Sequence, residues 1–210
     1  KYIFLKIKKF IKGDTLEVGA GIGSFTNNYK NISNQITLSE VDEDNFRVLK
    51  EKFKNTNYRF SNRTTKNIDT NFDTIMYLNV LEHIKEDYEE IKNAFEKLNN
   101  DGHLIILVPA HNRLYSKFDK AVGHFRRYEK DFFKNINIEN AKLEQLIYLD
   151  SLGYFLYYLN RIFFKEEIYP SKLKIFIWDK IFTPLSYILD KILMYKFGKN
   201  ILYVIKKSTL

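Results

Sequence analysis

The sequence contains no cysteine among its 210 residues. This absence excludes a disulfide framework and any metal site built on thiolates, and it fits a reducing compartment. The four histidines (His83, His103, His111 and His124) lack the spacing of a zinc motif, so we expect no metal. No uncharged apolar run approaches the ~18 residues that a membrane span requires. Lysines interrupt residues 1–12 too often for a signal peptide. We therefore expect a cytoplasmic protein, with peripheral contact at the inner membrane as an open alternative.

Positive charge is unevenly distributed along the chain. The net charge is +8, and residues 151–210 hold ten basic side chains against four acidic ones. This excess of positive charge either belongs to a hydrated, lysine-rich surface without a partner or attracts an anionic partner such as lipid headgroups, a phosphorylated substrate or nucleic acid. Nucleic acid is disfavoured, because the basic and aromatic residues follow helical spacing and not the exposed strand face of a nucleic-acid reader.

Strand-like and helix-like segments alternate through most of the chain. The alternation predicts a single α/β domain in which helices cover both faces of a mainly parallel sheet. The expected strands are residues 15–18, 35–40, 58–61, 72–78, 104–108, 142–148 and 201–205. The expected helices are residues 2–11, a segment from the first glycine-rich turn to about Lys30, and residues 42–54, 88–98 and 129–136.

Residues 151–200, ahead of the last expected strand, form an aromatic insertion. The final sixty residues hold fourteen of the thirty-four aromatic side chains. Thr183 and Pro184 predict the N-cap and first position of a helix. One face of that helix is expected to be apolar, with Leu185, Ile188, Leu189 and Ile192 on it. We expect amphipathic helices that cap the sheet edge. Alternatively, their aromatic side chains line an acceptor pocket or rest on a membrane surface.

A glycine-rich turn follows the first expected strand. In the stretch LEVGAGIGSFT, Gly19, Gly21 and Gly23 alternate with Ala20 and a second apolar residue. Glycine lets the backbone turn sharply and lets a ligand approach the main chain, and a following helix would offer free N–H groups. Ser24 stands where a dinucleotide fingerprint has its third glycine. The turn therefore predicts a nucleotide-type ligand and disfavours a dinucleotide.

Polar residues end the strands beside this turn. Glu40 lies about twenty residues beyond the glycines, the spacing at which an acidic residue meets a ribose diol. Asn62 ends the third strand, where it can reach an adenine edge, and Asn79 ends the fourth. The carboxyl ends of neighbouring parallel strands meet at one edge of a sheet, so we expect these residues around one ligand.

Three stretches together resemble class I S-adenosylmethionine-dependent methyltransferases, in the bacterial group that includes small-molecule and quinone-biosynthesis enzymes. They are LEVGAGIGSFT, the acidic end of QITLSE, and FDTIMYLNVLEHI. The resemblance implies a Rossmann-like, doubly wound sheet of seven strands with an antiparallel last strand, and S-adenosylmethionine as cofactor.

The resemblance also implies roles for single residues. Glu17 and the three glycines would line the methionine end of the cofactor, Glu40 would hold the ribose, and Asn79 would lie beside the methionine amino group. Ala20, Val41 and Asn62 complete the expected cofactor-binding set. Asn62 departs from the family pattern, in which the third strand usually ends on an acidic residue.

The long loop of residues 110–128 is the expected acceptor side, because loops of this length are usually functional. The run LVPAHNRLYSKFDKAVGHFRRY, residues 107–128, resembles a bacterial subgroup associated with glycosyltransferases of surface or lipid-linked glycans. His124 and His83 are the candidate proton acceptors, since imidazole titrates near neutral pH. A structural role for each histidine stays open.

Four further side chains are expected to bind the acceptor. Arg126 and Arg127 can hold a phosphate or carboxylate, or can instead form ion pairs with nearby acidic residues. His111 and Tyr115 complete the expected substrate-binding set. The sequence thus favours a methyltransferase acting on a small or amphiphilic acceptor. An NAD(P)-dependent oxidoreductase and a non-catalytic binding protein are the alternatives.

Overall fold

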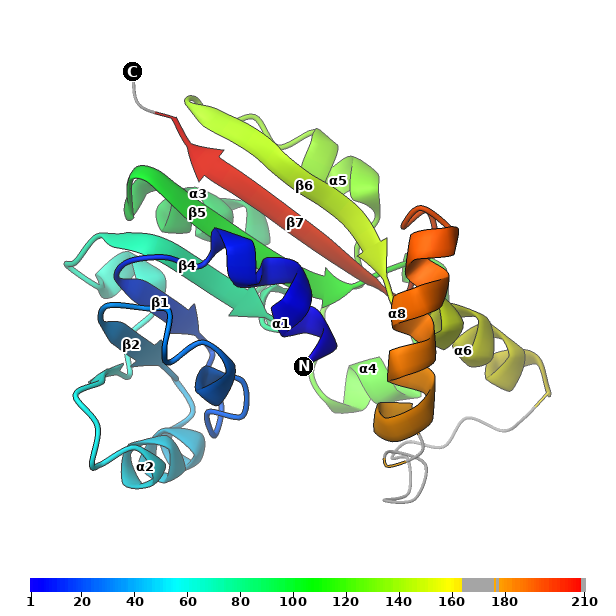
Figure 1. Cartoon of the computed structure of the whole chain (residues 1–210), viewed down its shortest axis with the longest axis horizontal. Helices are drawn as coiled ribbons and strands as arrows, with labels where there is room; N and C mark the ends of the chain where they lie inside the picture. Colours follow the sequence, from blue (N-terminus) through cyan, green and yellow to red (C-terminus); the bar gives the residue numbers. More distant parts are fainter. Residues whose placement is uncertain (164–175, 177, 209–210) are drawn as a thin grey trace.

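The computed structural model describes residues 1–163, 176 and 178–208 (Figure 1). These residues form a seven-stranded sheet of order β3-β2-β1-β4-β5-β7-β6. The strands are β1 (Thr15–Val18), β2 (Ile36–Ser39), β3 (Arg59–Ser61), β4 (Phe72–Leu78), β5 (Leu98–Pro109), β6 (Ala141–Leu149) and β7 (Asn200–Lys207). Strands β1 to β5 pair in parallel, whereas β7 runs antiparallel to both β5 and β6. The predicted Rossmann-like fold with an antiparallel last strand is confirmed.

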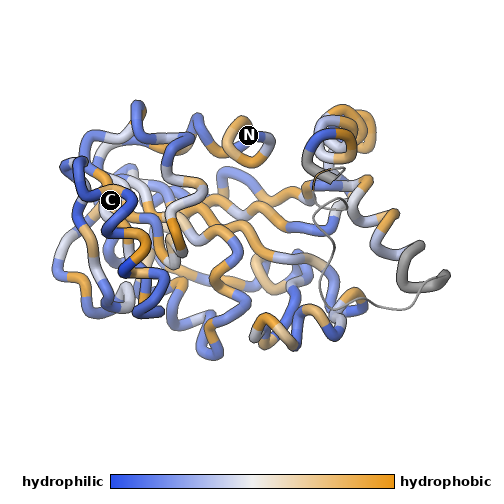
Figure 2. The backbone as a smooth tube through the Cα atoms, turned by 90° about the horizontal axis from the view of Figure 1, so that it is seen from below, coloured by the Kyte–Doolittle hydropathy of each residue, from blue (hydrophilic) through white to orange (hydrophobic). Residues whose placement is uncertain are grey.

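Helices cover both faces of the sheet. They are α1 (Tyr2–Ile7), α2 (Glu43–Lys52), α3 (Asp87–Glu96), α4 (Lys117–Ala121), α5 (Lys130–Lys134), α6 (Ser151–Phe163) and α8 (Thr183–Ile192). Side chains of β5 alternate between the faces: Leu104 and Ile106 pack with α3 and α5, while Ile105 and Leu107 pack with α1 and α2. Figure 2 shows the hydrophobic residues concentrated along the strands between these layers.

The prediction of a helix from the glycine turn to about Lys30 is wrong. The chain forms only a 3-10 turn there, over Thr26–Asn28. Glycine and asparagine in this stretch disfavour a helix. The hydroxyls of Thr26 and Tyr29 both donate to the Glu17 carboxylate, which fixes the segment in its non-helical form.

Two other boundaries differ from the expectation. The first helix ends at Ile7 and continues as a 3-10 turn over Lys8–Phe10. Strand β5 begins at Leu98 and not at residue 104. Its pairing with β4 changes register between Phe72 and Thr74, so that Leu98 and His103 both pair with β4 across this irregularity.

The insertion before β7 contains α6, a π-helical turn over Trp178–Phe182, and α8. The prediction that Thr183 is an N-cap is wrong, because the π-helical turn runs directly into α8 and places Phe182 at the cap. Pro184 lies in the first turn of α8, one position later than predicted. Residues 164–175 and 177 of the expected insertion lie outside the described residues, as do the side chains at 163 and 178.

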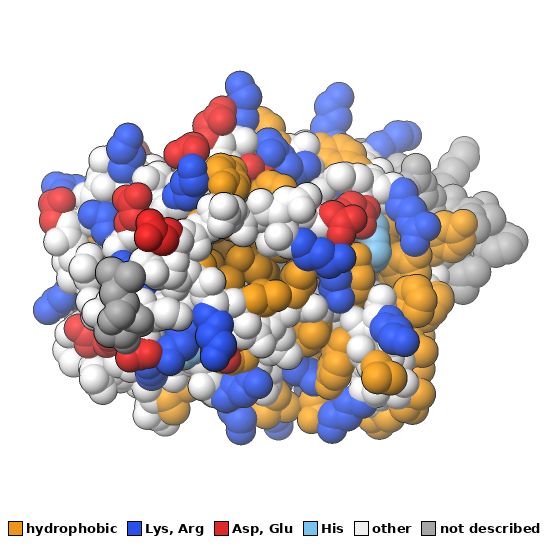
Figure 3. Space-filling view, turned by 90° about the horizontal axis from the view of Figure 1, so that it is seen from above, with side chains coloured by type: hydrophobic (Ala, Val, Ile, Leu, Met, Phe, Trp, Pro, Cys, Tyr) orange, Lys and Arg blue, Asp and Glu red, His pale blue; other side chains and the backbone are white. Residues whose placement is uncertain are grey.

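The apolar face of α8 is turned outward and does not pack on the sheet. Leu185, Ile188 and Ile192 are 51%, 57% and 70% exposed, whereas Ser186 and Asp190 on the opposite side are fully buried. Figure 3 shows hydrophobic side chains mixed with Lys and Arg at the end of the molecule where α6 and α8 lie.

Buried polar contacts hold α8 in place, together with the packing of Tyr187 against the Tyr2 ring. Asp190 accepts hydrogen bonds from the backbone N–H groups of Asp150 and Ser151, each over 2.8 Å, and from the hydroxyl of Tyr2. The Ser186 hydroxyl donates to Asp150 Oδ1 over 2.7 Å. These contacts join α8 to the start of α6 and to α1. Among the described residues, no helix is both long and apolar enough to cross a membrane.

Candidate functional site

The glycine turn and Glu40 meet at the carboxyl ends of β1 and β2. These strands pair in parallel with Val18 opposite Ser39, so the turn and Glu40 follow neighbouring strands. The Gly21 N–H donates to Glu40 Oε2 over 2.8 Å, and the Asp42 N–H donates to Oε1 over 2.9 Å. The structure brings together the two features that the sequence singled out.

The three glycines of the turn have different surroundings. Their φ angles are +62° at Gly19, +55° at Gly21 and +68° at Gly23. A Cβ on Gly19 would lie 2.6 Å from Val80, and one on Gly23 would lie 2.3 Å from the Phe53 ring. At Gly21 it would meet no described atom within 4 Å. Gly21 therefore borders open space, which is the room that a ligand held against the backbone requires.

Glu17 lies buried beneath the turn. Its Oε2 accepts hydrogen bonds from Thr26 Oγ1 at 2.8 Å and from the Tyr29 hydroxyl at 2.5 Å. Burial raises the pKa of Glu17 above its usual range, although both hydroxyls oppose the shift. Glu17 thus orders the segment after the turn, and its contact with a cofactor stays a prediction.

Val41, Asn62 and Asn79 are exposed residues at the same edge of the sheet. Asn79 follows β4, which pairs with β1, and its backbone has a φ of +57°. Its N–H donates to the Leu107 carbonyl over 2.8 Å. The side chain of Asn79 is therefore held at the edge where the glycine turn lies.

A cavity of about 400 Å³ opens beside Asn79 at the ends of β4 and β5. Its apolar and aromatic lining comes from Pro109, Phe118, Val122 and Tyr157. Its polar lining comes from Asn79, Glu82, His83, Asp119, His124, Arg127, Lys199 and Asn200. Val80 packs against Gly19, so the cavity adjoins the glycine turn.

Asp119 is the centre of a buried network in this cavity. It closes a capping box with Ser116 at the start of α4, and it is fully buried. Its Oδ1 accepts hydrogen bonds from His124 Nδ1 at 2.8 Å and from Arg127 Nε at 2.9 Å. Burial opposes ionisation of this carboxyl, but these two bonds outweigh it and hold the pKa of Asp119 well below its usual range. An ionised Asp119 orients the His124 ring and leaves Nε2 as the available nitrogen.

Glu82 presents an unpaired carboxylate to the same cavity. It is 1% exposed, and neither carboxylate oxygen has a hydrogen-bond partner among the described residues. His124 Nε2 lies 3.9 Å from Oε1. Burial raises the pKa of Glu82 to about 7. A buried carboxylate without partners is costly, so its position calls for an explanation.

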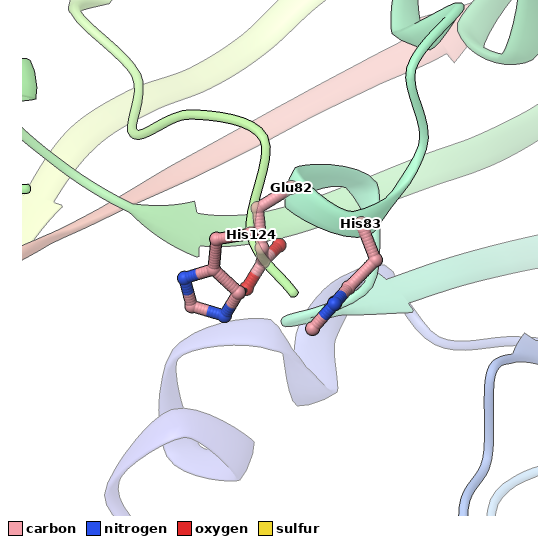
Figure 4. Close-up of side chains that lie close together, drawn as sticks. All are labelled: Glu82, His83 and His124. Atoms are coloured by element: carbon pink, nitrogen blue, oxygen red, sulfur yellow. The ribbon is translucent and has the colours of Figure 1, made fainter. Parts of the chain in front are cut away.

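The His83 and His124 rings are in contact beside Glu82. Their ring centroids lie 4.6 Å apart with the rings nearly perpendicular. Figure 4 shows the Glu82 carboxylate close to the two imidazoles. One ligand atom from each of Glu82, His83 and His124 lies within 4.8 Å of the others. The two candidate proton acceptors from the sequence are therefore brought together, around a carboxylate that the sequence did not single out.

The expected acceptor-binding set is only partly brought together. Arg127 lines the cavity with its guanidinium 5.0 Å from the Tyr157 ring. Arg126 instead pairs with Asp87 at 2.9 Å. Tyr115 donates to the His124 carbonyl over 2.6 Å and so supports the backbone there.

His111 lies away from the cavity lining. Its Nε2 lies 3.1 Å from the Gly198 carbonyl, and its ring stacks on Tyr148. The structure thus gives His111 a packing role and leaves its contact with an acceptor a prediction.

Sequence reasoning missed Glu82, Asp119 and Tyr157 as cavity residues. Ser116 and Asp119 have the spacing of a capping box, which could have identified α4 inside the loop expected to be irregular. Glu82 lies in the stretch LEH next to His83, but its burial depends on the chain folding back at Phe125, whose N–H donates to the Glu82 carbonyl over 2.8 Å.

Comparisons with known proteins agree with this architecture. The family described as "Methyltransferase domain" matches residues 3–146. A search of the curated proteins finds no match.

Solved structures share the fold over nearly the whole chain. The N-methyltransferase NodS from Bradyrhizobium japonicum, in complex with S-adenosyl-L-homocysteine, matches this chain with a TM-score of 0.62 at 12% sequence identity. The superposition covers 99% of this chain and 84% of the NodS chain. An S-adenosylmethionine-dependent methyltransferase from Clostridium acetobutylicum has a TM-score of 0.60 at 15% identity, with coverages of 99% and 90%. The [4+2]-cyclase SpnF has a TM-score of 0.67 at 12% identity, with coverages of 99% and 80%. At these identities the likeness shows the fold alone.

Proposed function

Because the chain belongs to the family of methyltransferase domains, we propose that it transfers a methyl group from S-adenosylmethionine to a small or amphiphilic acceptor held in the cavity beside Asn79. One observation carries this proposal. The open glycine turn and the cavity follow adjacent strands, β1 and β4, so donor and acceptor can meet at one edge of the sheet. The prediction of a methyltransferase is confirmed by the family, and the NAD(P)-dependent alternative is set aside.

The residues at the turn fit such a cofactor. Gly21 borders open space, and Glu40 and Asn79 lie on either side of it at strand ends. Glu40 would hold the ribose hydroxyls, and the turn and Asn79 would hold the amino-acid end. When bound, S-adenosylmethionine supplies a methyl group on a positively charged sulfur. The protein then has to position a nucleophile and exclude water.

His124 is the group placed to accept a proton from the acceptor in the metal-free protein. Its Nδ1 is bonded to Asp119, so Nε2 is the nitrogen available to the cavity. Asp119 also stabilises the imidazolium that forms after proton transfer. This arrangement supports an oxygen or nitrogen nucleophile as acceptor.

An amphiphilic acceptor, linked to a lipid or to a glycan, is supported by what surrounds the cavity. Tyr157 of α6 lines it, while the neighbouring Phe155 and Tyr158 are exposed. The exposed apolar face of α8 belongs to the same helical pair, since α6 and α8 are joined through Asp150 and Asp190. We propose that this end of the molecule rests on an anionic lipid surface and that the acceptor enters the cavity from there.

A ligand-binding screen tests the cofactor. Thermal unfolding is followed with S-adenosylmethionine, S-adenosylhomocysteine, NAD and NADP. A ligand at 100 times its Kd stabilises the native state by about 2.7 kcal/mol, so the first two should raise the Tm by several degrees. A rise with NAD or NADP alone contradicts the proposal.

A labelling experiment tests the acceptor. The protein is incubated with methyl-labelled S-adenosylmethionine and a cell extract, which is then partitioned between chloroform–methanol and water. We expect label in the organic phase or at the interface. Label confined to the aqueous phase contradicts an amphiphilic acceptor, and cofactor binding without any transfer would instead support the non-catalytic alternative.

A further inference from the structure

We propose that Glu82, His83 and His124 form a binding site for a divalent transition-metal cation, which binds an oxygen of the methyl acceptor. This proposal rests on the proposed function for the identity of the reaction, but the binding of the cation does not depend on it. The expectation of no metal came from histidine spacing along the chain. The three residues become neighbours only when residues 123–125 fold back over the turn that holds Glu82 and His83.

The geometry provides three ligands and leaves one side open. The three ligand atoms lie within 4.8 Å of one another and border a cavity of about 400 Å³. Ligand atoms about 2.0–2.2 Å from a cation lie roughly 3–4 Å apart, so side-chain movements of about 1 Å would bring these three to coordination distance. Figure 4 shows the carboxylate and the two rings gathered at one place. Three protein ligands with an open position are typical of catalytic metal sites and not of structural ones.

The burial of Glu82 without a hydrogen-bond partner in the described part of the chain is an independent observation that indicates a ligand. Glu82 is 99% buried, borders the cavity, and has no hydrogen-bond partner on either oxygen among the described residues. Buried carboxylates are normally paired or bound to a metal. A cation at this position would satisfy both oxygens of a group that the surrounding protein leaves unsatisfied.

The surroundings of His124 match those of a metal-binding histidine. Ligating histidines usually donate their second ring N–H to a carboxylate, which fixes the ring and raises its basicity. His124 Nδ1 lies 2.8 Å from Asp119 Oδ1, and Asp119 is itself held by Arg127 and Ser116. His124 therefore has its metal-binding nitrogen already turned away from this partner.

The ligand set indicates the class of cation. Two imidazole nitrogens and one carboxylate suit Zn²⁺, Mn²⁺, Fe²⁺ or Co²⁺, whereas Mg²⁺ and Ca²⁺ prefer oxygen ligands alone. The role is that of a Lewis acid without redox change. An acceptor hydroxyl bound at the open position loses its proton to solvent. A bond then forms between its oxygen and the methyl carbon as the carbon–sulfur bond breaks, and the electron pair of that bond stays on sulfur as a neutral thioether.

The test measures binding of Co²⁺ and Zn²⁺ to the whole chain by titration calorimetry and by the visible absorption of Co²⁺. We expect one site per chain, with the affinity reduced roughly tenfold or more by Glu82→Gln and by His83→Asn. His83 is exposed, so its variant should fold even if Glu82→Gln does not. His103→Asn is the matched control, since His103 lies on β5 away from the cavity lining, and it should bind both cations as the unchanged protein does.

The outcomes separate this proposal from the proposed function. S-adenosylhomocysteine binding is measured on the same samples. If the unchanged protein binds neither cation while it still binds S-adenosylhomocysteine, the metal site is wrong and the methyltransferase proposal stands with His124 as the proton acceptor. If it binds the cations and the two variants bind them equally well, the ligand assignment is wrong. Loss of S-adenosylhomocysteine binding alone affects the proposed function and not the metal site.

Discussion

Two glycines of the same turn differ in what a side chain would meet, and this difference leads to a paired prediction. Gly21 and Gly23 both have positive φ, so alanine at either position adds about 1–2 kcal/mol of backbone strain. At Gly23 the new methyl group also meets the Phe53 ring at 2.3 Å. We expect Gly23→Ala to destabilise the fold by about 2–4 kcal/mol. Gly21→Ala should cost only the strain while lowering S-adenosylhomocysteine affinity roughly tenfold or more.

Urea unfolding and titration calorimetry on both variants check this pair. The control is built in, because each variant introduces one methyl group at a positive-φ glycine of the same turn. Unchanged ligand affinity in Gly21→Ala would show that the open space beside the turn is not the ligand site.

His103 makes stability depend on pH through a residue remote from the cavity. Burial lowers the pKa of His103 below its usual 6.5, helped by the charges of Lys12 and Lys206 and opposed by Glu144 and Asp101. The unfolded chain therefore binds a proton more readily than the folded one at this residue. The contribution of His103 to stability is present above pH 6.5 and is lost as the pH falls through 6.5 toward the lower folded pKa.

We expect His103→Phe to reduce the loss of stability between pH 7.5 and pH 5.5. The variant also removes Nδ1, a buried atom without a partner among the described residues. Urea unfolding at the two pH values gives the measurement, and the difference between the two proteins removes the contributions of the other histidines. An identical pH dependence in both proteins contradicts the prediction.

At the scale of single elements, α8 is attached through a buried carboxylate. Asp190→Ala removes the acceptor for two backbone N–H groups at the start of α6 and for the Tyr2 hydroxyl. Unsatisfied buried donors are costly, so we expect a loss of about 2–4 kcal/mol in the free energy of unfolding. Asp131→Ala removes an exposed pair with Lys134 and should change stability by less than about 0.5 kcal/mol. Similar effects of the two substitutions would refute the role of Asp190 as an anchor.

The same helix shows where element prediction from sequence stops. The periodicity of Leu185, Ile188 and Ile192 correctly indicates one apolar face, but periodicity does not say whether that face turns toward the sheet or toward solvent. Its direction is set by Ser186 and Asp190, whose partners lie about 40 residues earlier in the chain. No local pattern reports such contacts.

At the scale of the whole molecule, the sheet could be predicted because strand-like and helix-like segments alternate and because β5 and β7 contain continuous apolar runs. The glycine turn and Glu40 could also be predicted from the sequence, since their spacing is fixed by one strand–turn–strand unit. The cavity could not. Glu82 and Asp119 become partners of His83 and His124 through tertiary folding, and the buried polar network has no periodicity that could have revealed it.

The outward face of α8 predicts how the whole molecule meets a lipid surface. Ile188 and Ile192 are more than half exposed, and the neighbouring Lys191 and Lys196 are exposed as well. Inserting apolar side chains into an interface gains about 25 cal/mol per Å² of buried surface, and each lysine near anionic headgroups adds about 1 kcal/mol. We expect the protein to float with vesicles that contain phosphatidylglycerol, to float less with phosphatidylcholine alone, and to be released by high salt.

Replacing both isoleucines with serine should lower vesicle binding roughly 30-fold, because each side chain contributes on the order of 1 kcal/mol when half its surface is buried. The matched control is Leu5→Ser with Val48→Ser, which removes two exposed apolar side chains from α1 and α2 and should leave flotation unchanged. Light scattering on the same proteins tests the competing occupant, a second copy of the chain. Suppose that the unchanged protein forms a dimer and does not float, and that the double isoleucine variant is a monomer. This face would then be a subunit interface, and the acceptor would have to reach the cavity from solution.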